Sequence, residues 1–104
     1  MHARVSTYQF PLDTIDDAIS TFESGFEDEG LAAMQEAMIL VDRSTGKALT
    51  ITLWESADAA AASRDAANRA RSQAADAVAG SIQSVEEFEV GSRQLRSTAR
   101  SASV

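Results

Sequence analysis

The sequence predicts one small α+β domain in which the elements follow in the order β-α-β-β-α-β. Three observations lead to this prediction. The chain of 104 residues has the length of a single domain. Its apolar content of 44% is sufficient for a packed core. Short runs rich in β-branched and aromatic residues alternate with segments whose apolar residues have helical spacing.

The first strand is expected at residues 3–10, which are rich in β-branched and aromatic types, and Pro11 ends it. Asp13 then has the position of a helix N-cap. The helix is expected to fray through the acidic residues 27–29 and to end at Gly30. Its apolar residues recur at the spacing of one helical face: Ile15, Ala18, Ile19, Phe22 and Phe26.

A β-hairpin is expected next. The apolar run at residues 37–41 is typical of a strand that is buried on both faces. The turn at residues 42–47 contains Gly46, which suits the left-handed conformation of a bulged hairpin. The returning strand is expected at residues 48–54, where successive side chains point to opposite faces. Leu49, Ile51 and Leu53 therefore share one face, and Thr50, Thr52 and Trp54 share the other.

A second helix of about 23 residues is expected to begin after its cap, Ser56, and to be closed by Gly80. Twelve alanines lie between Ala57 and Ala79. We interpret them as strong helix formers that let the helix approach a sheet closely, rather than as a functional interface of small residues.

The last strand is expected at residues 82–90, where apolar residues recur before the composition changes. Residues 92–104 are rich in serine and arginine and contain few apolar residues. We therefore predict a folded domain at residues 1–91 and a disordered basic tail at residues 92–104.

This order of elements is the ferredoxin-like arrangement, in which helices cover only one face of a four-stranded antiparallel sheet. The other face carries apolar side chains and needs a cover. A second copy of the chain is the natural cover, and two sheets facing each other form a dimeric α+β barrel. A chain this short buries a limited share of its own surface, which also favours a homodimer.

The charge of the chain argues against several kinds of partner. Residues 1–90 hold all sixteen acidic residues and six of the nine basic ones, a net charge of -10. Such a surface repels phosphate backbones, so no nucleic-acid partner is expected. No apolar run approaches the roughly 20 residues of a membrane span, and the first residues lack the apolar stretch of a secretory signal. We expect a cytoplasmic protein without a membrane partner.

The residue types also argue against most metal and nucleophile chemistry. The absence of cysteine excludes disulfides, thiolate metal sites and a cysteine nucleophile. The one histidine, His2, lies at a terminus, so neither a histidine-based triad nor a multi-histidine metal site is expected from one chain. Glu23 and the acidic residues 27–29 lack the pattern of a calcium loop, and we interpret them as a solvated face.

The hairpin and the start of the second helix carry a resemblance to a known family. The residues are Leu40-Val41-Asp42-Arg43-Ser44-Thr45-Gly46, then Leu53-Trp54-Glu55-Ser56 and a helix that begins Ala57-Asp58-Ala59. In these segments the chain resembles the antibiotic biosynthesis monooxygenase (ABM) superfamily, and within it a set of uncharacterised actinobacterial members. The resemblance extends over about residues 3–92 and supports the same fold, which hosts many activities.

The resemblance implies two kinds of activity, of which haem degradation is not expected. Haem-degrading members bind iron through a histidine about ten residues after the strand-ending tryptophan. That region here reads Ala62-Ser63-Arg64-Asp65. The asparagine that such members carry on the first strand is also missing, with Ser6 or Thr7 in its place.

The other implied activity is cofactor-independent oxygenation of a flat aromatic molecule of the phenol or anthrone type. Such an enzyme holds the substrate, stabilises its deprotonated form and excludes water, and the substrate supplies the electrons, so no cofactor is expected. The catalytic candidates are Trp54 as an aromatic wall or N–H donor, Tyr8 as a hydrogen-bonding group and Arg64 as a cationic donor. The candidates for the substrate pocket are Gln9, Trp54, Met38 and Phe22.

The alternative hypothesis is a non-catalytic dimer that binds a small hydrophobic ligand or serves as an accessory or stress-related protein. The lack of an evident general base favours it. The cavity beside Trp54 distinguishes the two hypotheses. A closed apolar cavity with two or more convergent polar groups favours the enzyme, whereas a space filled by Met34, Met38 or Phe22 favours a structural role.

Overall fold

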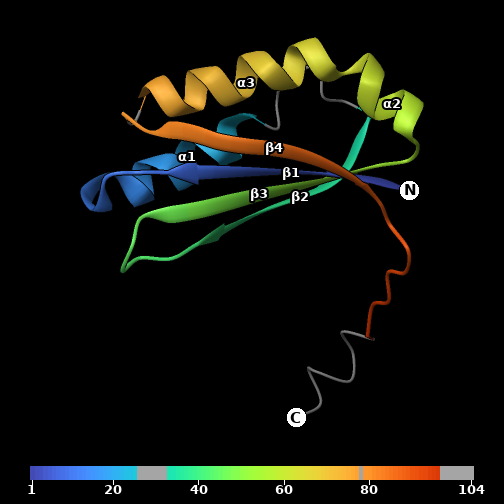
Figure 1. Cartoon of the computed structure of the whole chain (residues 1–104), viewed down its shortest axis with the longest axis horizontal. Coiled ribbons are helices and arrows are strands. Elements are labelled where there is room, and N and C mark those ends of the chain that lie inside the picture. Colours follow the sequence, from blue (N-terminus) through green and yellow to red (C-terminus); the bar gives the residue numbers. More distant parts are fainter. Residues whose placement is uncertain (26–32, 78, 97–104) are drawn as a thin grey trace.

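The computed structural model of the protein describes residues 1–25, 33–77 and 79–96. A four-stranded antiparallel sheet, in the order β2-β3-β1-β4, has helices packed over one face (Figure 1). The strands are β1 (His2–Gln9), β2 (Met34–Val41), β3 (Lys47–Trp54) and β4 (Ser81–Glu89). The 3₁₀ helix η1 (Leu12–Thr14) precedes α1 (Ile15–Gly25), and α2 (Ala57–Ala62) precedes α3 (Arg64–Ala77). The predicted ferredoxin-like order is confirmed.

β1 occupies the interior of the sheet and positions the site. It pairs with β3 on one side and β4 on the other, so that Arg4 lies opposite both Thr52 and Glu87. Because alternate residues of a strand point to the same face, the side chains of Arg4, Ser6 and Tyr8 all face the helices. All three residues are buried.

The hairpin turn has the predicted conformation. Gly46 has a φ of 80°, which is accessible to glycine at little cost. A Cβ at this position would overlap the carbonyl oxygen of Phe10, to which Gly46 lies close. The backbone of the turn is further held by the carbonyl oxygen of Asp42, which accepts the N–H of Gly46 at 2.9 Å.

β2 is partly buried on one face and exposed on the other, in contrast to the prediction of a strand buried on both faces. It forms an edge of the sheet. Ala37 and Ile39 face the helices, whereas Met38 and Leu40 face away from them and are 40% and 47% exposed. The apolar run is continuous because the sheet face without helices is itself apolar.

The start of the first helix differs from the prediction. Asp13 is not an N-cap but lies inside η1. The carbonyl oxygen of Pro11 accepts hydrogen bonds from both the backbone N–H and the hydroxyl of Thr14, which closes a 3₁₀ turn before α1 begins at Ile15. The predicted fraying at residues 27–29 and the stop at Gly30 lie outside the described residues.

The second helix is not continuous as predicted but consists of α2 and α3. The Ser56 cap is confirmed, because its hydroxyl oxygen accepts the N–H of Ala59 at 3.1 Å. At Ser63 the backbone leaves the helical conformation (φ -95°, ψ 5°), and its N–H is shared between the carbonyl oxygens of Ala59 and Ala60. The Ala60 carbonyl also accepts a hydrogen bond from the side chain of Arg4.

The end of α3 also differs in one respect. The left-handed residue is Ala79, with a φ of 56°, and not Gly80. The N–H of Gly80 donates to the carbonyl of Ala75 at 2.8 Å, as in a Schellman motif. Glycine is needed at position 80 for another reason, since a Cβ there would overlap the ring of Phe10.

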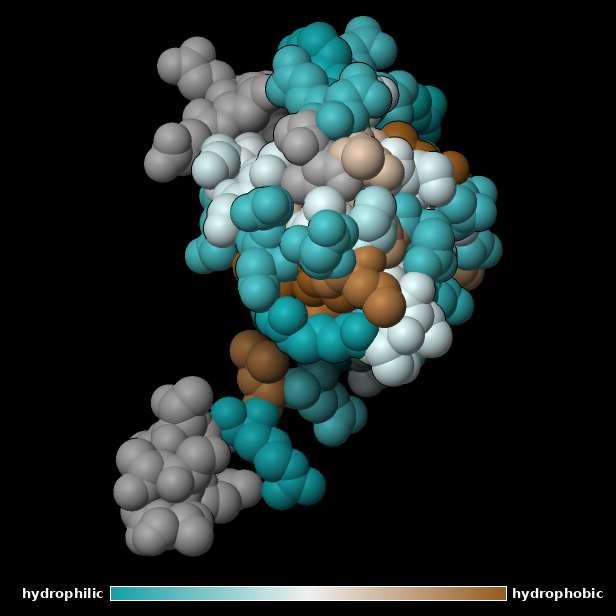
Figure 2. Space-filling view, turned by 90° about the vertical axis from the view of Figure 1, so that its left-hand side faces the viewer, coloured by the Kyte–Doolittle hydropathy of each residue, from teal (hydrophilic) through white to brown (hydrophobic). Residues whose placement is uncertain are grey.

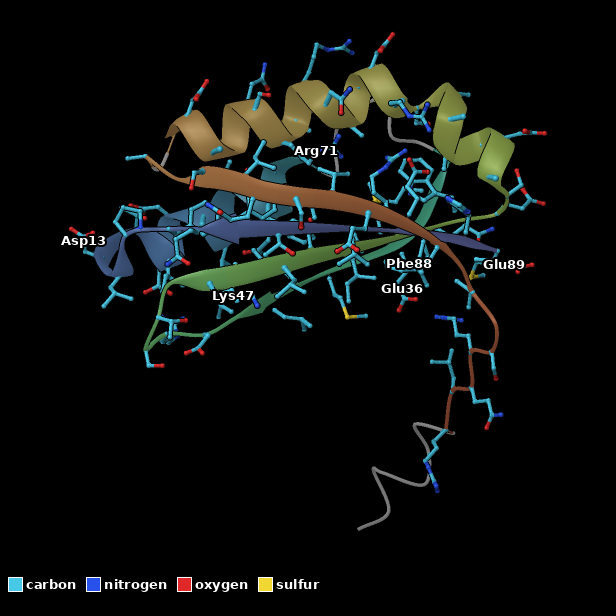
Figure 3. All side chains as sticks on the ribbon, viewed as in Figure 1. Asp13, Glu36, Lys47, Arg71, Phe88 and Glu89 are labelled. Carbon is cyan, nitrogen blue, oxygen red and sulfur yellow. The ribbon has the colours of Figure 1, made fainter. Side chains whose placement is uncertain are left out.

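The sheet face opposite the helices is largely apolar. Figure 3 shows Phe88 on this side of the sheet, and 49% of its surface is exposed. Strand alternation and register place further apolar residues on the same face: Val5, Met38, Leu40, Leu49, Ile51 and Leu53. We call this set, with Phe88, the open face. Seen from the end at which the β2–β3 turn lies, hydrophilic side chains cover most of the surface and apolar ones are exposed in limited patches (Figure 2).

Residues 91–96 follow β4 and leave the sheet without forming a helix or strand (Figure 1). Arg93 in this segment pairs with Glu36 of β2, with 2.6 Å between Nη2 and Oε2. Disorder of residues 92–104 stays a prediction, and residues 97–104 lie outside the described ones. No helix within the described ranges is long and apolar enough to cross a membrane.

Candidate functional site

A cavity of about 90 Å³ lies between the sheet and the helices α1 and α3, and it is partly open to solvent. Its floor is formed by β1 and β3, and Phe22 of α1 and Arg71 of α3 contribute to its walls. Met34 and Phe22 line this space without filling it. The cavity lies beside Trp54, which is the place where the enzyme and the structural role predict different arrangements.

Two strands supply a polar floor beneath apolar walls. In the sheet register Arg4 lies opposite Thr52, and Ser6 lies opposite Thr50. All four side chains line the cavity, because residues two apart on a strand share a face. A small set of polar groups within an apolar enclosure is the usual composition of a small-molecule site.

Trp54 is fully buried and forms part of the wall. Its indole N–H donates to the hydroxyl oxygen of Thr52 at 3.0 Å, so the N–H is engaged within the protein. The guanidinium of Arg4 lies over the indole ring, 5.3 Å from its centroid, in a cation–π arrangement. Trp54 therefore orients Arg4 as well as enclosing the cavity.

Arg4 is the most deeply buried charged residue of the site, with 2% of its surface exposed. Its Nη2 donates to the carbonyl oxygen of Ala60 at 2.9 Å. Its Nη1 is buried and has no hydrogen-bond partner among the described residues. Burial lowers the pKa of Arg4, and the charge of Glu87 opposes this shift. Arginine nevertheless stays protonated in proteins.

Tyr8 lies on the same face of β1 and is 4% exposed. Its ring stacks on that of Phe10, with 5.4 Å between the centroids. Burial raises the pKa of the Tyr8 hydroxyl, although the hydroxyl of Thr50 and the charge of Arg71 act in the opposite direction. Tyr8 is thus protonated at neutral pH and is suited to donate a hydrogen bond.

Arg71 reaches the cavity from α3, on the side of that helix that faces the sheet (Figure 3). Its guanidinium donates to the side-chain oxygen of Asn68. Partial burial lowers the pKa of Arg71, whereas the nearby groups Tyr8 and Glu87 raise it. Arg4 and Arg71 are the only charged residues that line the cavity in the described part of the chain.

The structure brings together three of the residues proposed from sequence: Trp54, Tyr8 and Phe22 all line the cavity. Three others lie outside it. Gln9 follows Tyr8 and therefore points to the other face of the strand, where its amide nitrogen donates to the carbonyl oxygen of Thr45. Met38 lies on the open face. Arg64, the first residue of α3, is exposed and pairs with Glu87 of β4 at 3.1 Å.

Arg4 and Arg71 did not emerge from the sequence analysis. The signal for Arg4 is its position two residues before Ser6 and four before Tyr8, on the same face of the strand. Arg71 follows Ala67 by four residues and therefore shares its helix face. Within the ranges that the structure describes, no group of three or more His, Cys, Asp or Glu residues is placed to hold a metal ion.

Comparisons with known proteins support the fold. No protein-family model matches the chain, and no curated protein matches it. Among solved structures, a proposed antibiotic biosynthesis monooxygenase from Chloroflexus aurantiacus is 13% identical with a TM-score of 0.65, covering 89% of this chain and 96% of its own. A similar protein from Deinococcus radiodurans is 15% identical with a TM-score of 0.62, covering 93% and 99%.

A dimeric ferredoxin-like protein from an uncultured marine organism has a TM-score of 0.69 at 7% identity, covering 92% of this chain and 100% of its own. At sequence identities this low, the structural similarity establishes a shared fold and nothing further. The chain thus has the ferredoxin-like α+β fold that is found in ABM-like proteins. The fold alone does not determine an activity.

Proposed function

We propose that the protein is an ABM-like, cofactor-independent monooxygenase that oxidises a small phenol, with nearest relatives among actinobacterial ABM members. The observation that carries the proposal is the convergence of Arg4, Tyr8 and Arg71 on an apolar cavity walled by Trp54. Cationic and hydroxyl donors around an apolar enclosure are suited to stabilise a phenolate, which is the form that reacts with oxygen.

The size of the cavity limits the substrate. An apolar cavity of roughly 150 Å³ holds one benzene molecule. The cavity here measures about 90 Å³ and is partly open. A single aromatic ring therefore occupies it and extends toward the opening, which favours monocyclic phenols over anthrones.

The reaction balances without a cofactor. The phenolate carbon opposite the oxygen bonds to O₂, and the resulting peroxide takes up a proton. Loss of water then leaves a quinone, so one oxygen atom enters the product and the other leaves as water. The substrate supplies all four electrons. Arg4 and Arg71 stabilise the phenolate, and protonated Tyr8 donates to the developing peroxide.

Oxygen uptake tests this proposal. We expect the purified protein to consume O₂ with a series of monocyclic phenols that carry hydrogen at the carbon opposite the hydroxyl, and Tyr8→Phe to lower the rate at least about tenfold. Arg69→Gln, on the exposed side of α3, is the matched control and should retain the rate. Phenols that bind without any O₂ uptake would contradict the proposed activity.

A second candidate is a non-catalytic protein that binds a small hydrophobic ligand in the same cavity. The observation in its favour is that the described lining contains no carboxylate or imidazole to accept the phenol proton. Ligand binding that stabilises the protein, without turnover in the oxygen assay, would favour this candidate.

We also propose that two copies pair through the open face, as two sheets of a dimeric barrel. The apolar side chains of this face, among them Phe88 and Leu40, are 49% and 47% exposed in the single chain. Large contiguous apolar surfaces of this kind mark association sites. Light scattering should give a dimer for the wild type and a monomer for Leu40→Glu.

Leu12→Glu is the control for the dimer, because Leu12 is also exposed but lies in η1, away from the open face. This variant should remain dimeric. A wild-type monomer at all accessible concentrations would contradict the dimer and leave the cavity within each chain. The cytoplasmic location expected from the sequence stays a prediction.

A further inference from the structure

We infer that the cavity recognises a planar aromatic monoanion, either an aromatic carboxylate or an acidic phenol that arrives ionised, with its negative group between Arg4 and Arg71. This inference rests on the proposed function of the same cavity and names its substrate class. The carrying observation is that Arg4 lines the cavity and that its buried Nη1 has no hydrogen-bond partner among the described residues.

A buried guanidinium nitrogen without a partner is costly, and the cost is removed when a ligand accepts its hydrogen bond. The two other contacts of Arg4 hold the group in place. The Trp54 ring lies against the guanidinium, and the carbonyl of Ala60 accepts from Nη2, which leaves Nη1 as the donor for a ligand. The donor is therefore oriented before any ligand binds.

The charge around the cavity favours an anion over a neutral acceptor. Arg4 belongs to the floor of the cavity, on β1, and Arg71 belongs to a wall, on α3. Burial lowers the pKa of Arg4 most, and the charge of Glu87 opposes this shift. The charges of Arg71 and Arg64 lower the pKa of Arg4 further, so these cations repel Arg4. An anion between Arg4 and Arg71 replaces this repulsion by attraction in a weakly screened environment.

Glu87 attracts both arginines, but its hydrogen bonds are made outside the cavity. Its carboxylate is bonded to His2 at 2.9 Å and to Arg64 at 3.1 Å. It does not line the cavity, and no other carboxylate does so within the described residues. The chain as a whole carries a net charge of -7. The charged residues that line the cavity in the described part of the chain are both positive, in contrast to this overall negative charge.

The fluorescence of Trp54 reports ligand binding, because Trp54 is the only tryptophan of the chain and lines the cavity. Fluorescence titrations with benzoate and benzamide compare two planar ligands of nearly the same shape that differ in charge. We expect benzoate to bind at least about tenfold more tightly, which corresponds to 1.4 kcal/mol. Bound 4-nitrophenol should also be more ionised than free 4-nitrophenol at the same pH, as seen in its visible absorbance.

Variants connect this preference to the two arginines. Arg71→Gln should reduce the preference for benzoate to about threefold or less. Arg69→Gln removes the same charge from the exposed side of the same helix and should leave the preference unchanged. Arg4→Gln should abolish the preference, and circular dichroism tests whether this variant is folded. Arg71→Gln decides the question if Arg4→Gln does not fold.

Equal affinities for benzoate and benzamide, no detectable binding of benzoate, or an unchanged preference in Arg71→Gln would each overturn the inference. The outcome is separable from that of the oxygenase proposal. Preferential binding of benzoate without O₂ uptake from any phenol would retain the anion site and reject the oxygenase. O₂ uptake without a preference for anions would retain the oxygenase and reject the anion site.

Discussion

The guanidinium of Arg4 lies over the indole ring of Trp54, 5.3 Å from its centroid, and donates to the carbonyl of Ala60 at the break between α2 and α3. One buried side chain thus connects the central strand, the end of β3 and the helix layer. The indole N–H of Trp54 in turn donates to the hydroxyl oxygen of Thr52 at 3.0 Å, which links Arg4, Trp54 and Thr52. The cavity wall is therefore a bonded unit, and a change at either residue should affect both stability and binding.

Replacing Trp54 by phenylalanine tests this unit. Trp54→Phe removes the hydrogen bond to Thr52 and part of the surface against which Arg4 packs, so we expect a loss of about 1–3 kcal/mol in the free energy of unfolding. Benzoate affinity should also decrease. Calorimetry is the method for the ligand, since this variant lacks the only tryptophan. Leu12→Ala, at an exposed site in η1, should change stability by less than about 0.5 kcal/mol.

The left-handed residue after α3 gives a prediction of opposite sign. Ala79 has a φ of 56°, where a Cβ is unfavourable, so Ala79→Gly should stabilise the protein by about 0.5–1 kcal/mol in urea denaturation. Ala61→Gly, within α2, should instead destabilise it by about 1 kcal/mol. Gly80→Ala should be destabilising, because the added methyl group would overlap Phe10. Destabilisation by Ala79→Gly would contradict the observed geometry.

Removal of the tail tests the predicted domain boundary. A chain that ends at Gly91 loses the ion pair between Arg93 and Glu36, whose side chains are 35% and 36% exposed. Partly exposed pairs contribute at most about 1 kcal/mol. We therefore expect the thermal midpoint to fall by only a few degrees. A fall of ten degrees or more would show that the tail is part of the folded domain.

The order of elements could be predicted because periodicity is a local property of the sequence. Alternation in residues 48–54 correctly placed Thr50, Thr52 and Trp54 on one face. The break at Ser63 could not be predicted in the same way. The alanine-rich segment has uniform helix propensity, and the break coincides with a bond to Arg4, some 56 positions away in sequence.

The site was predicted less completely, for a related physical reason. Alternation shows which strand residues share a face, but it does not show which face the helices cover. Tyr8 and Gln9 were therefore both candidates, although only Tyr8 faces the cavity. Arg4 was missed because a charged side chain in a strand is ordinarily solvated, whereas here Trp54 and the Ala60 carbonyl compensate part of its burial.

The carboxylate of Glu87 gives a prediction about pH. The hydrogen bond with His2 is the main cause that lowers the pKa of Glu87 below its ordinary value of 4.5, and the charges of Arg4 and Arg64 lower it further. A lowered pKa means that the folded state favours the ionised carboxylate. Its contribution to stability is therefore complete at neutral pH and is lost as the pH falls below about 4.5 through the folded-state pKa.

We expect Glu87→Gln to be less stable than the wild type at pH 7, with a difference that decreases steadily between pH 5 and pH 3. Urea denaturation of both proteins at several pH values measures this difference. Glu89→Gln changes an exposed glutamate on the same strand (Figure 3) and should alter stability at pH 7 by less than about 0.5 kcal/mol. A difference between Glu87→Gln and wild type that stays constant down to pH 3 would show that the carboxylate gains nothing from His2 and the two arginines on folding.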